Sequence, residues 1–334
     1  MKAAILAPVA WRTPPRHYGP WEQVASNIAE GLIKLGVDVT LFATGDSITA
    51  GSLQSVCEQG YEEDRSQDAK VLECLHISNL MEQAADFDII HNNFDFLPLT
   101  YSGLIDTPVV TTIHGFSSPR IIPVYKKYNS KGHYVSISNA DRSPDLNYLA
   151  TVYNGLDTKD FKFTDKPQDY LVYFGRIHHD KGAAEAIQIA LKSNKRLLMA
   201  GIIQDENYWK EKVEPYLNDQ IQYIGHAGPE KRNELLGNAL ALLHPINFAE
   251  PFGMSVAEAM LCGTPVIAFN KGSMPELIKH QQTGFLVDTV DEAVDAIGQL
   301  GSINRKNCHE WASSQFSKEK MAKDYFKLYQ QIVG

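Results

Sequence analysis

Cysteine is scarce in this chain, and the cysteines lie far apart. Among 334 residues there are four, at Cys57, Cys74, Cys262 and Cys308. None of them has the short spacing of a zinc site or a redox pair. We therefore expect reduced, buried thiols, and the pattern argues against a disulfide scaffold or a cysteine-ligated metal.

Positive charge and long hydrophobic runs are also in short supply. Lys and Arg number 31 against 40 Asp and Glu, which gives a formal net charge of −9. This balance argues against nucleic-acid binding and against broad adhesion to anionic lipid. No stretch is long and apolar enough to span a bilayer. The apolar run Ala3–Ala10 is interrupted by Pro8, which favours a first strand over a signal peptide, and we expect a cytoplasmic protein.

The remaining composition is that of an ordinary globular protein with a full core. Hydrophobic residues make up 44% and charged residues 21% of the chain. A length of 334 residues is roughly twice that of one domain, so two domains are expected.

The first half begins with a strand–helix–strand pattern. Apolar runs at Ala3–Pro8 and Val37–Ala43 flank the helical periodicity of Trp21–Leu35. This is the parallel crossover unit of a Rossmann-like domain. The loop between lacks the G-x-G-x-x-G fingerprint of dinucleotide sites and instead carries Gly19-Pro20-Trp21-Glu22. Pro20 has no N–H to offer a phosphate, so this loop is either a ligand-binding element or a stiffened surface turn.

Polar residues follow several later strands, where open α/β sheets place ligands. The strand Phe87–Asn93 ends in polar residues, and His114 directly follows the strand Pro108–Ile113. A histidine there is either a core or capping residue or a ligand-binding group. Residues Tyr134–Asp141 predict a strand entering a helix capped by Ser138 or Asn139.

The second half opens with cations at the end of a strand. Gly175 ends the apolar run that begins at Tyr170, Arg176 and Lys181 follow, and a helix is expected after Gly182. Two cations near a helix start can clamp a diphosphate, with Arg binding two oxygens and Lys acting as a point charge.

The most informative stretch runs from Pro245 to Ile267. A buried strand ending at His244 precedes it, a turn carries Glu250, and a helix from Ser255 ends at Gly263. The start of a helix suits an anion, and paired carboxylate hydrogen bonds suit vicinal sugar hydroxyls. Glu250 and Glu258 flank this turn, although two such glutamates alone could equally be solvated side chains.

This segment resembles the signature of family 4 retaining glycosyltransferases, which have the GT-B fold. The shared pattern is a Glu, seven residues and a second Glu, with Pro-Phe-Gly after the first, here Glu250 to Glu258. The resemblance implies an α/β protein with two Rossmann-like parallel-sheet domains facing a central cleft.

The resemblance also implies roles for individual residues. Glu250 would bind hydroxyls of the transferred sugar, Glu258 the nucleotide ribose, and Arg176 with Lys181 the diphosphate. His114 would lie against the donor sugar, and the catalytic set is then His114, Glu250, Arg176 and Lys181. The further donor-binding candidates are Phe252, Gly253, Met254, Ser255, Gly225, His226 and Ala227, with His226 equally an exposed turn residue. The acceptor-side candidates are Arg16, His17, Tyr18 and Gly19.

The same resemblance implies the domain limits. Residues 1–157 would form an acceptor-side domain and 169–315 a nucleotide-sugar domain, joined by a linker at 158–168. Residues 316–334 would form a helix that packs back across the junction.

The implied function is transfer of a hexose from a nucleotide-diphosphate sugar to a carbohydrate or other hydroxyl acceptor, with retention of configuration. UDP-sugars are favoured as donors and GDP-sugars come next. The nucleotide sugar is a co-substrate, no further cofactor is expected, and we see no His/Asp cluster with metal spacing, so metal independence is expected. Peripheral membrane contact would follow only from a lipid acceptor. Three alternatives remain open: a sugar-nucleotide epimerase of the same fold, a non-catalytic nucleotide-sugar binding protein, and a phosphorylase of related fold, which normally needs a pyridoxal lysine for which no context is apparent here.

Overall fold

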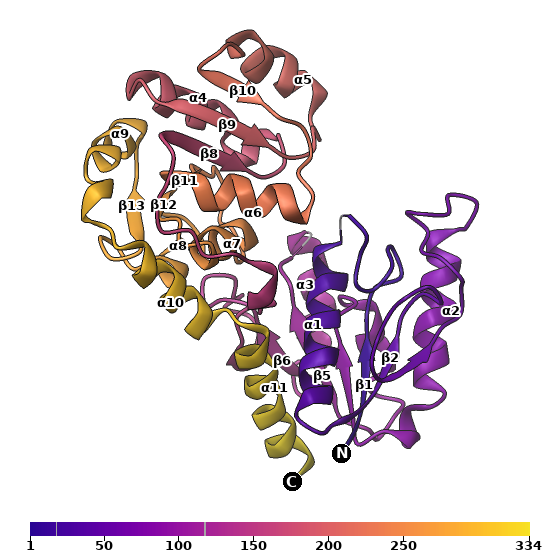
Figure 1. Cartoon of the computed structure of the whole chain (residues 1–334). Helices are drawn as coiled ribbons and strands as arrows, with labels where there is room; N and C mark the ends of the chain where they lie inside the picture. Colours follow the sequence, from indigo (N-terminus) through magenta and orange to yellow (C-terminus); the bar gives the residue numbers. More distant parts are fainter. Residues whose placement is uncertain (18, 117) are drawn as a thin grey trace. The chain divides into compact units, whose positions relative to one another are not determined.

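The computed structural model describes residues 1–17, 19–116 and 118–334. They form two compact units, one of Met1–Leu156 with Ser317–Gly334 and the other of Asp157–Phe316. Each unit is built on a parallel sheet with helices packed against it, as expected from the sequence (Figure 1).

The first unit contains a seven-stranded sheet in its described residues, in the order β3-β2-β1-β4-β5-β6-β7. Its strands are β1 Lys2–Leu6, β2 Asp38–Phe42, β3 Ser52–Gln54, β4 Ile89–Asn92, β5 Val109–Ile113, β6 His133–Ser136 and β7 Tyr148–Thr151. Its helices are α1 Pro20–Lys34, α2 Ala69–Met81, α3 Ile122–Tyr128 and α11 Lys318–Val333, with 3-10 turns at Ala84–Asp86, Leu97–Tyr101 and Pro119–Ile121.

Strand β1 shows why the apolar runs of this unit are continuous. Ala3 and Ile5 lie in one core cluster, with residues of α1 and α11, whereas Ala4 and Leu6 lie in another, with residues of α2. Successive side chains of a strand point to opposite faces, so a strand covered on both faces needs apolar residues at every position.

The second unit contains a six-stranded sheet in the order β10-β9-β8-β11-β12-β13. Its strands are β8 Tyr170–Phe174, β9 Arg196–Ala200, β10 Ile221–Tyr223, β11 Ala241–His244, β12 Val266–Phe269 and β13 Gly284–Val287. Its helices are α4 Ala183–Lys192, α5 Glu206–Tyr208, α6 Pro229–Asn238, α7 Met254–Leu261, α8 Met274–Leu277, α9 Val290–Gly298 and α10 Arg305–Gln315. A π-helix at Trp209–Val213 and 3-10 turns at Thr158–Asp160, His179–Lys181, Glu214–Tyr216 and Leu300–Ser302 complete it.

In both sheets the strand order reverses at one point. The reversal lies between β1 and β4 in the first unit and between β8 and β11 in the second. Loops leaving the carboxyl ends of two such strands diverge to opposite faces and leave a crevice, which is where ligands bind in open α/β sheets.

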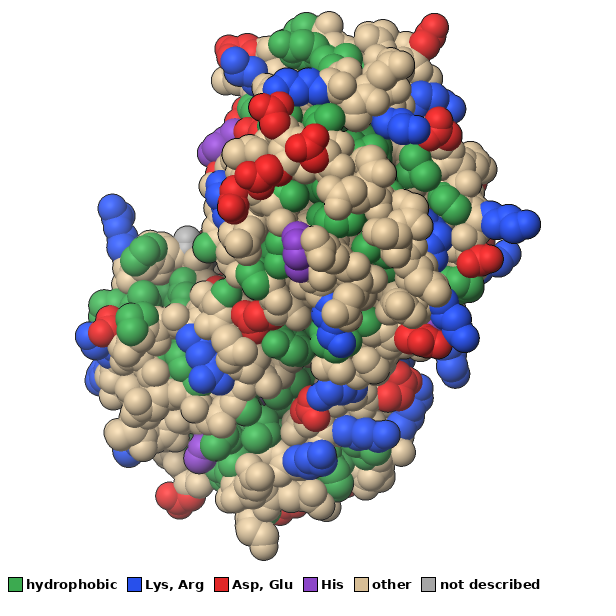
Figure 2. Space-filling view, turned by 90° about the vertical axis from the view of Figure 1, so that its left-hand side faces the viewer, with side chains coloured by type: hydrophobic (Ala, Val, Ile, Leu, Met, Phe, Trp, Pro, Cys, Tyr) green, Lys and Arg blue, Asp and Glu red, His purple; other side chains and the backbone are tan. Residues whose placement is uncertain are grey.

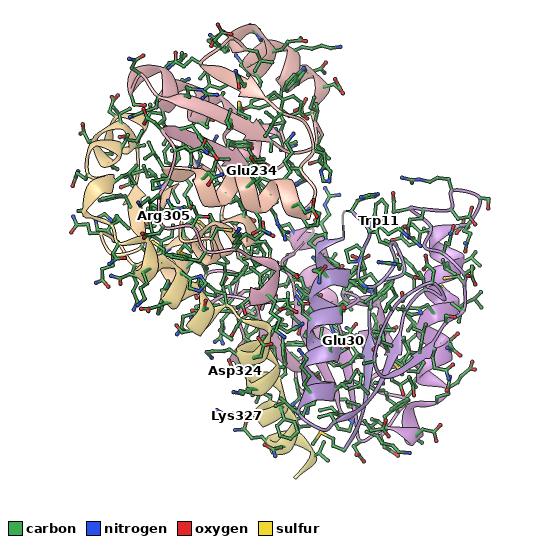
Figure 3. All side chains as sticks on the ribbon, viewed as in Figure 1. Trp11, Glu30, Glu234, Arg305, Asp324 and Lys327 are labelled. Carbon is green, nitrogen blue, oxygen red and sulfur yellow. The ribbon has the colours of Figure 1, made fainter. Side chains whose placement is uncertain are left out.

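The stretch 158–168 is bound to the second unit. The Arg305 side chain, only 7% exposed, donates to Thr164 O at 2.8 Å and to Ala239 O at 2.9 Å. The Gln168 N–H also donates to Asn238 O at 2.7 Å. This stretch is therefore fastened by its backbone to the unit that follows it (Arg305 is labelled in Figure 3).

Helix α11 follows the second unit in sequence but packs in the first, beside α1 (Figure 1). Tyr329 OH lies 2.6 Å from His91 Nδ1, and His91 Nε2 lies 2.7 Å from Thr112 Oγ1. Tyr325 OH lies 2.7 Å from the same threonine oxygen. Burial lowers the pKa of His91 to about 3, so this buried network ties α11 to β4 and β5 with a neutral imidazole.

Two local expectations were wrong, and strand β3 was not foreseen. Cys74 is exposed rather than buried. No helix follows β6: Ser138 Oγ accepts from Asp141 N–H at 3.1 Å, but the chain continues in turns. Pro144 explains this difference, because it has no N–H and disfavours helical geometry in the residue before it.

The surface mixes charges of both signs. On the face that Figure 2 displays, lysine and arginine side chains are interspersed with aspartate and glutamate. Among the described residues, no helix has the length and apolarity needed to cross a bilayer.

A substitution at Gly31 tests the packing of α11 on α1. A Cβ atom at Gly31 would lie 2.5 Å from the Cβ of Ala322 on α11. We expect Gly31→Val to lower the free energy of unfolding by about 1–3 kcal/mol, as overpacking of a close helix contact does. Thermal unfolding would show this as a lower midpoint. Gly298→Ala is the control, since nothing lies within 4 Å of a Cβ there; equal midpoints for the two variants would contradict the contact.

Candidate active site

The second unit gathers its candidate residues at the strand reversal. Arg176 and Lys181 lie in the loop that leaves β8, and Glu250 lies in the loop that leaves β11. The two strands are neighbours in the sheet. Residues far apart in the sequence therefore lie at the carboxyl ends of two neighbouring strands.

A close backbone approach joins these two loops. Gly182 has φ +73°, and a Cβ atom there would lie 1.9 Å from Pro245 O, so no other residue fits. The Asn247 N–H donates to Asp180 O at 2.7 Å. Together these contacts hold residues 180–182 against the loop after β11.

The result is an ion pair between Lys181 and Glu250. Their side chains are 15% and 11% exposed, and Lys181 Nζ also lies 4.7 Å from the centre of the Phe248 ring. His244 Nε2 lies 3.7 Å from Glu250 Oε2 and has no hydrogen-bond partner among the described residues. Burial, and secondarily the charge of Lys181, lowers the pKa of His244 to about 3, so this imidazole is neutral near pH 7.

The turn that carries Glu250 packs against the backbone of Gly272 and Ser273. A Cβ atom at Gly272 would lie 2.3 Å from Glu250 N, and the Ser273 N–H donates to Glu250 O at 2.9 Å. Gly253 has φ +86° and precedes α7, and no described side chain caps that helix. The N-terminus of α7, at Met254 and Ser255, therefore keeps the positive end of a helix dipole next to Glu250.

Glu258 lies inside α7 and is 8% exposed. Arg232 Nη1 lies 3.1 Å from its Oε1, and Arg232 also lies over the Phe161 ring at 4.6 Å. Burial raises the pKa of Glu258, and Arg232 acts in the opposite direction. Arg232 is a residue that sequence reasoning missed, because nothing in its local sequence distinguishes it from a solvated helix arginine.

The remaining donor-side candidates have separate surroundings. Arg176 donates a hydrogen bond to Gln204 Oε1, whereas Lys181 pairs with Glu250. His226 is exposed after β10, the edge strand, and Gly225 O accepts from the Gly201 N–H at 3.1 Å. Ala227 is buried in a cluster with Ala200 and Leu235. Phe252 is buried as well, so its side chain belongs to the core of this unit.

One group of possible metal ligands was not expected from the sequence. His178, His179 and Asp205 have ligand atoms that all lie within 4.8 Å of one another, a group that could hold a metal ion. The backbone bridge between Ile177 and Ile203 brings them together. Two adjacent histidines do not reveal that Asp205, far away in the sequence, lies beside them. The sequence alone therefore did not predict this group.

In the first unit, His114 lies after β5, as predicted. Its Nε2 lies 3.1 Å from Asn93 Oδ1, and its ring stacks on Trp21 with the ring centres 5.6 Å apart. Burial lowers the pKa of His114 to about 3. The neutral ring donates through Nε2–H to Asn93, which leaves Nδ1 as an acceptor with no partner among the described residues.

The predicted acceptor-side residues differ in their surroundings. Arg16 pairs with Asp46 at 2.9 Å and Glu63 at 2.7 Å, and His17 is exposed. Tyr18 lies outside the described residues. Gly19 borders a cavity of about 540 Å³ at the reversal between β1 and β4.

Three carboxylates that sequence reasoning missed line this cavity: Glu22, Glu73 and Asp95. Burial raises the pKa of all three, that of Glu22 to about 7. Glu22 belonged to the Gly19-Pro20-Trp21-Glu22 loop but was given no role. Asp95 has φ +96°, an unusual conformation for a residue other than glycine, and sequence does not reveal it.

Two family models match the chain and together cover most of it. The model described as Glycosyltransferase Family 4 matches residues 21–159, and the model described as Glycosyl transferases group 1 matches residues 157–315. The chain belongs to glycosyltransferase family 4. The resemblance noted at Glu250 to Glu258 is thereby confirmed, and so is the enzyme class.

Proteins similar over the whole length of this chain are also known. An uncharacterized glycosyltransferase of Methanocaldococcus jannaschii is 20% identical over 97% of this chain and 94% of its own length. The sucrose-phosphate synthase structure from Thermosynechococcus elongatus has a TM-score of 0.78 at 18% identity, covering 99% of each chain. The HepE structure of Anabaena with UDP and glucose has a TM-score of 0.74 at 19% identity, covering 99% of this chain and 100% of that one. These likenesses confirm the GT-B fold, whereas the chain spans about half or less of several other curated relatives.

Glu22 makes a pH-dependent contribution to the stability of this glycosyltransferase. The folded chain keeps the proton up to a pKa of about 7, while the unfolded chain releases it near 4.5, so rising pH between these values weakens folding. The loss amounts to about 3 kcal/mol, from 1.36 kcal/mol per pKa unit.

We expect Glu22→Gln to remove that loss, because the amide mimics the neutral carboxyl. Thermal unfolding should show the variant more stable than wild type at about pH 8 and equal to it below pH 4.5. The exposed Glu82→Gln serves as the control. A constant difference between wild type and Glu22→Gln at every pH would refute this account.

Proposed function

We propose that this glycosyltransferase moves a hexose from a nucleotide-diphosphate sugar to a hydroxyl acceptor, with retention of configuration and without a metal ion. The observation that carries the proposal is the Lys181–Glu250 pair beside the uncapped start of α7. A cation and a helix N-terminus suit a diphosphate, and an adjacent carboxylate suits sugar hydroxyls. Arg176 supplies a second cation on the same loop.

Each group then has a distinct task. Lys181, Arg176 and the α7 amides stabilise the negative charge that grows on the leaving diphosphate. Glu250 accepts hydrogen bonds from the sugar, and Glu258 accepts them from the ribose through the oxygen that Arg232 does not contact. His114 Nδ1, an acceptor without a partner, is proposed to accept from a sugar hydroxyl. We assign no side chain as a nucleophile, so the leaving phosphate would itself help to deprotonate the acceptor.

UDP-sugars are the favoured donors and GDP-sugars come next. The support is general resemblance, including the HepE structure, which is a complex with UDP and glucose. The acceptor is proposed to be a carbohydrate or another hydroxyl compound.

Turnover of a nucleotide-sugar panel tests the proposal. Release of nucleoside diphosphate and sugar products would be followed by mass, with and without mixed sugar acceptors and with and without EDTA. We expect acceptor-dependent release from one donor, unaffected by EDTA. Loss of activity with EDTA would instead direct attention to His178, His179 and Asp205. An epimerised sugar without acceptor would contradict the transferase, and binding without turnover would leave a binding protein.

Variants locate that activity. Glu250→Gln and Arg176→Ala should each lower kcat/KM by about 100-fold, the size found when one stabilising group at a transition state is removed. The controls are Glu230→Gln and Arg196→Ala, both exposed and away from the reversal between β8 and β11. Equal activity of Arg176→Ala and Arg196→Ala would contradict the role of the β8 loop.

A further inference from the structure

The cavity of the first unit has features that the proposed function does not use. It has a volume of about 540 Å³ and lies where β1 and β4 diverge. Its walls come from the loop after β1, the start of α1, helix α2 and the residues that follow β4. All of the described residues that line it belong to the first unit.

Aromatic side chains form much of the wall. Trp11, Trp21, Tyr61, Phe94 and Phe96 border the cavity, and Trp11 is labelled in Figure 3. Trp21 is also the ring on which His114 stacks. Flat aromatic faces pack well against the C–H faces of a sugar ring.

The polar part of the wall is acidic. Glu22, Glu73 and Asp95 border the cavity, whereas the described residues that line it include no Lys, Arg or His. Tyr61 OH donates to Glu73 Oε1 at 3.1 Å, and Tyr125 OH donates to Asp95 Oδ1 at 2.6 Å. These bonds hold the side chains of Glu73 and Asp95, and Asp95 also accepts from the backbone of Phe96. A carboxylate has about four lone-pair sites, so both groups keep capacity to accept from a ligand.

The two arginines in the loop after β1, Arg12 and Arg16, bond to other groups of the first unit. Arg16 pairs with Asp46 and Glu63, and Arg12 Nε donates to Pro14 O at 2.9 Å. Neither guanidinium borders the cavity.

The start of α1 is also closed to an external anion. Pro20 has no N–H, and the Glu22 carboxylate accepts from the backbone of Glu22 and Trp11. Glu22 Oε2 lies so close to Gly19 that a Cβ there would be 2.9 Å from it. The start of this helix is therefore occupied by the helix's own carboxyl group.

We propose that this cavity binds the acceptor as a neutral or amine-bearing sugar or polyol and rejects phosphorylated and carboxylated ones. The carboxylates accept from hydroxyls or an ammonium group, and an anion would meet three acidic side chains without a compensating cation. That the ligand is the acceptor rests on the proposed function, whereas the binding preference of the cavity does not depend on it.

Direct binding to the full chain tests this preference without any turnover. Saturation-transfer NMR would compare glucose, 6-amino-6-deoxyglucose and glucose 6-phosphate, which differ at one position only. We expect the amino sugar to bind most tightly, glucose next, and glucose 6-phosphate at least about tenfold more weakly than the amino sugar, the factor that one charge-assisted hydrogen bond provides.

Variants place the ligand in the cavity. Glu73→Gln keeps the bond from Tyr61 and should weaken binding of the amino sugar by about tenfold while changing glucose little, because only the ammonium requires the charge. The matched control is Glu82→Gln at the end of the same helix, where the side chain is exposed.

Three results would overturn the inference: equal or tighter binding of glucose 6-phosphate, an unchanged affinity of Glu73→Gln for the amino sugar, or no binding of any of the three compounds. Failure of the proposed function has a different signature, namely binding with this preference but no nucleoside diphosphate release from any donor.

Discussion

The close approach of the Gly182 backbone to Pro245 is the contact on which the candidate donor site depends. Any side chain at Gly182 would overlap Pro245 O, and separating the two loops would break the pair between Lys181 and Glu250. Two partly buried charges stabilise each other only when they are in contact; apart, each would remain desolvated without compensation. The absence of a side chain at Gly182 therefore allows the two loops to approach closely enough for Lys181 and Glu250 to pair.

The two units use the same architectural position for opposite electrostatics. In the second unit the strand reversal carries Arg176, Lys181 and the uncapped start of α7, a setting for an anion. In the first unit it carries Glu22, Glu73 and Asp95, and the helix start is occupied by the chain's own carboxylate. This division suits the proposed reaction, in which the donor is a diphosphate and the acceptor is a hydroxyl compound. Parallel sheets supply the position, and the side chains at the strand ends supply the chemistry.

Much of this could be predicted from the sequence because it depends on local pattern. Continuous apolar runs such as Ala241–His244 indicated buried parallel strands, and the turn at Glu250 with the helix after Gly253 was evident from its residues. Strand β3 escaped prediction because three residues at a sheet edge carry almost no periodic signal. The partners of the site also escaped it. Arg232 contacts Glu258, Glu73 contacts Tyr61, and Asp95 contacts Tyr125. These are tertiary contacts between residues far apart in the sequence, and no spacing rule predicts them.

Titration calorimetry can show whether a nucleoside diphosphate binds at the strand reversal of the second unit. UDP and GDP would be titrated into the wild-type chain, Arg176→Ala and the exposed Arg196→Ala. The account predicts binding of one of these nucleotides, weakened by about tenfold or more in Arg176→Ala and unchanged in Arg196→Ala, as expected for loss of a guanidinium–phosphate contact. Equal affinity of all three proteins, or no binding of either nucleotide, would contradict it.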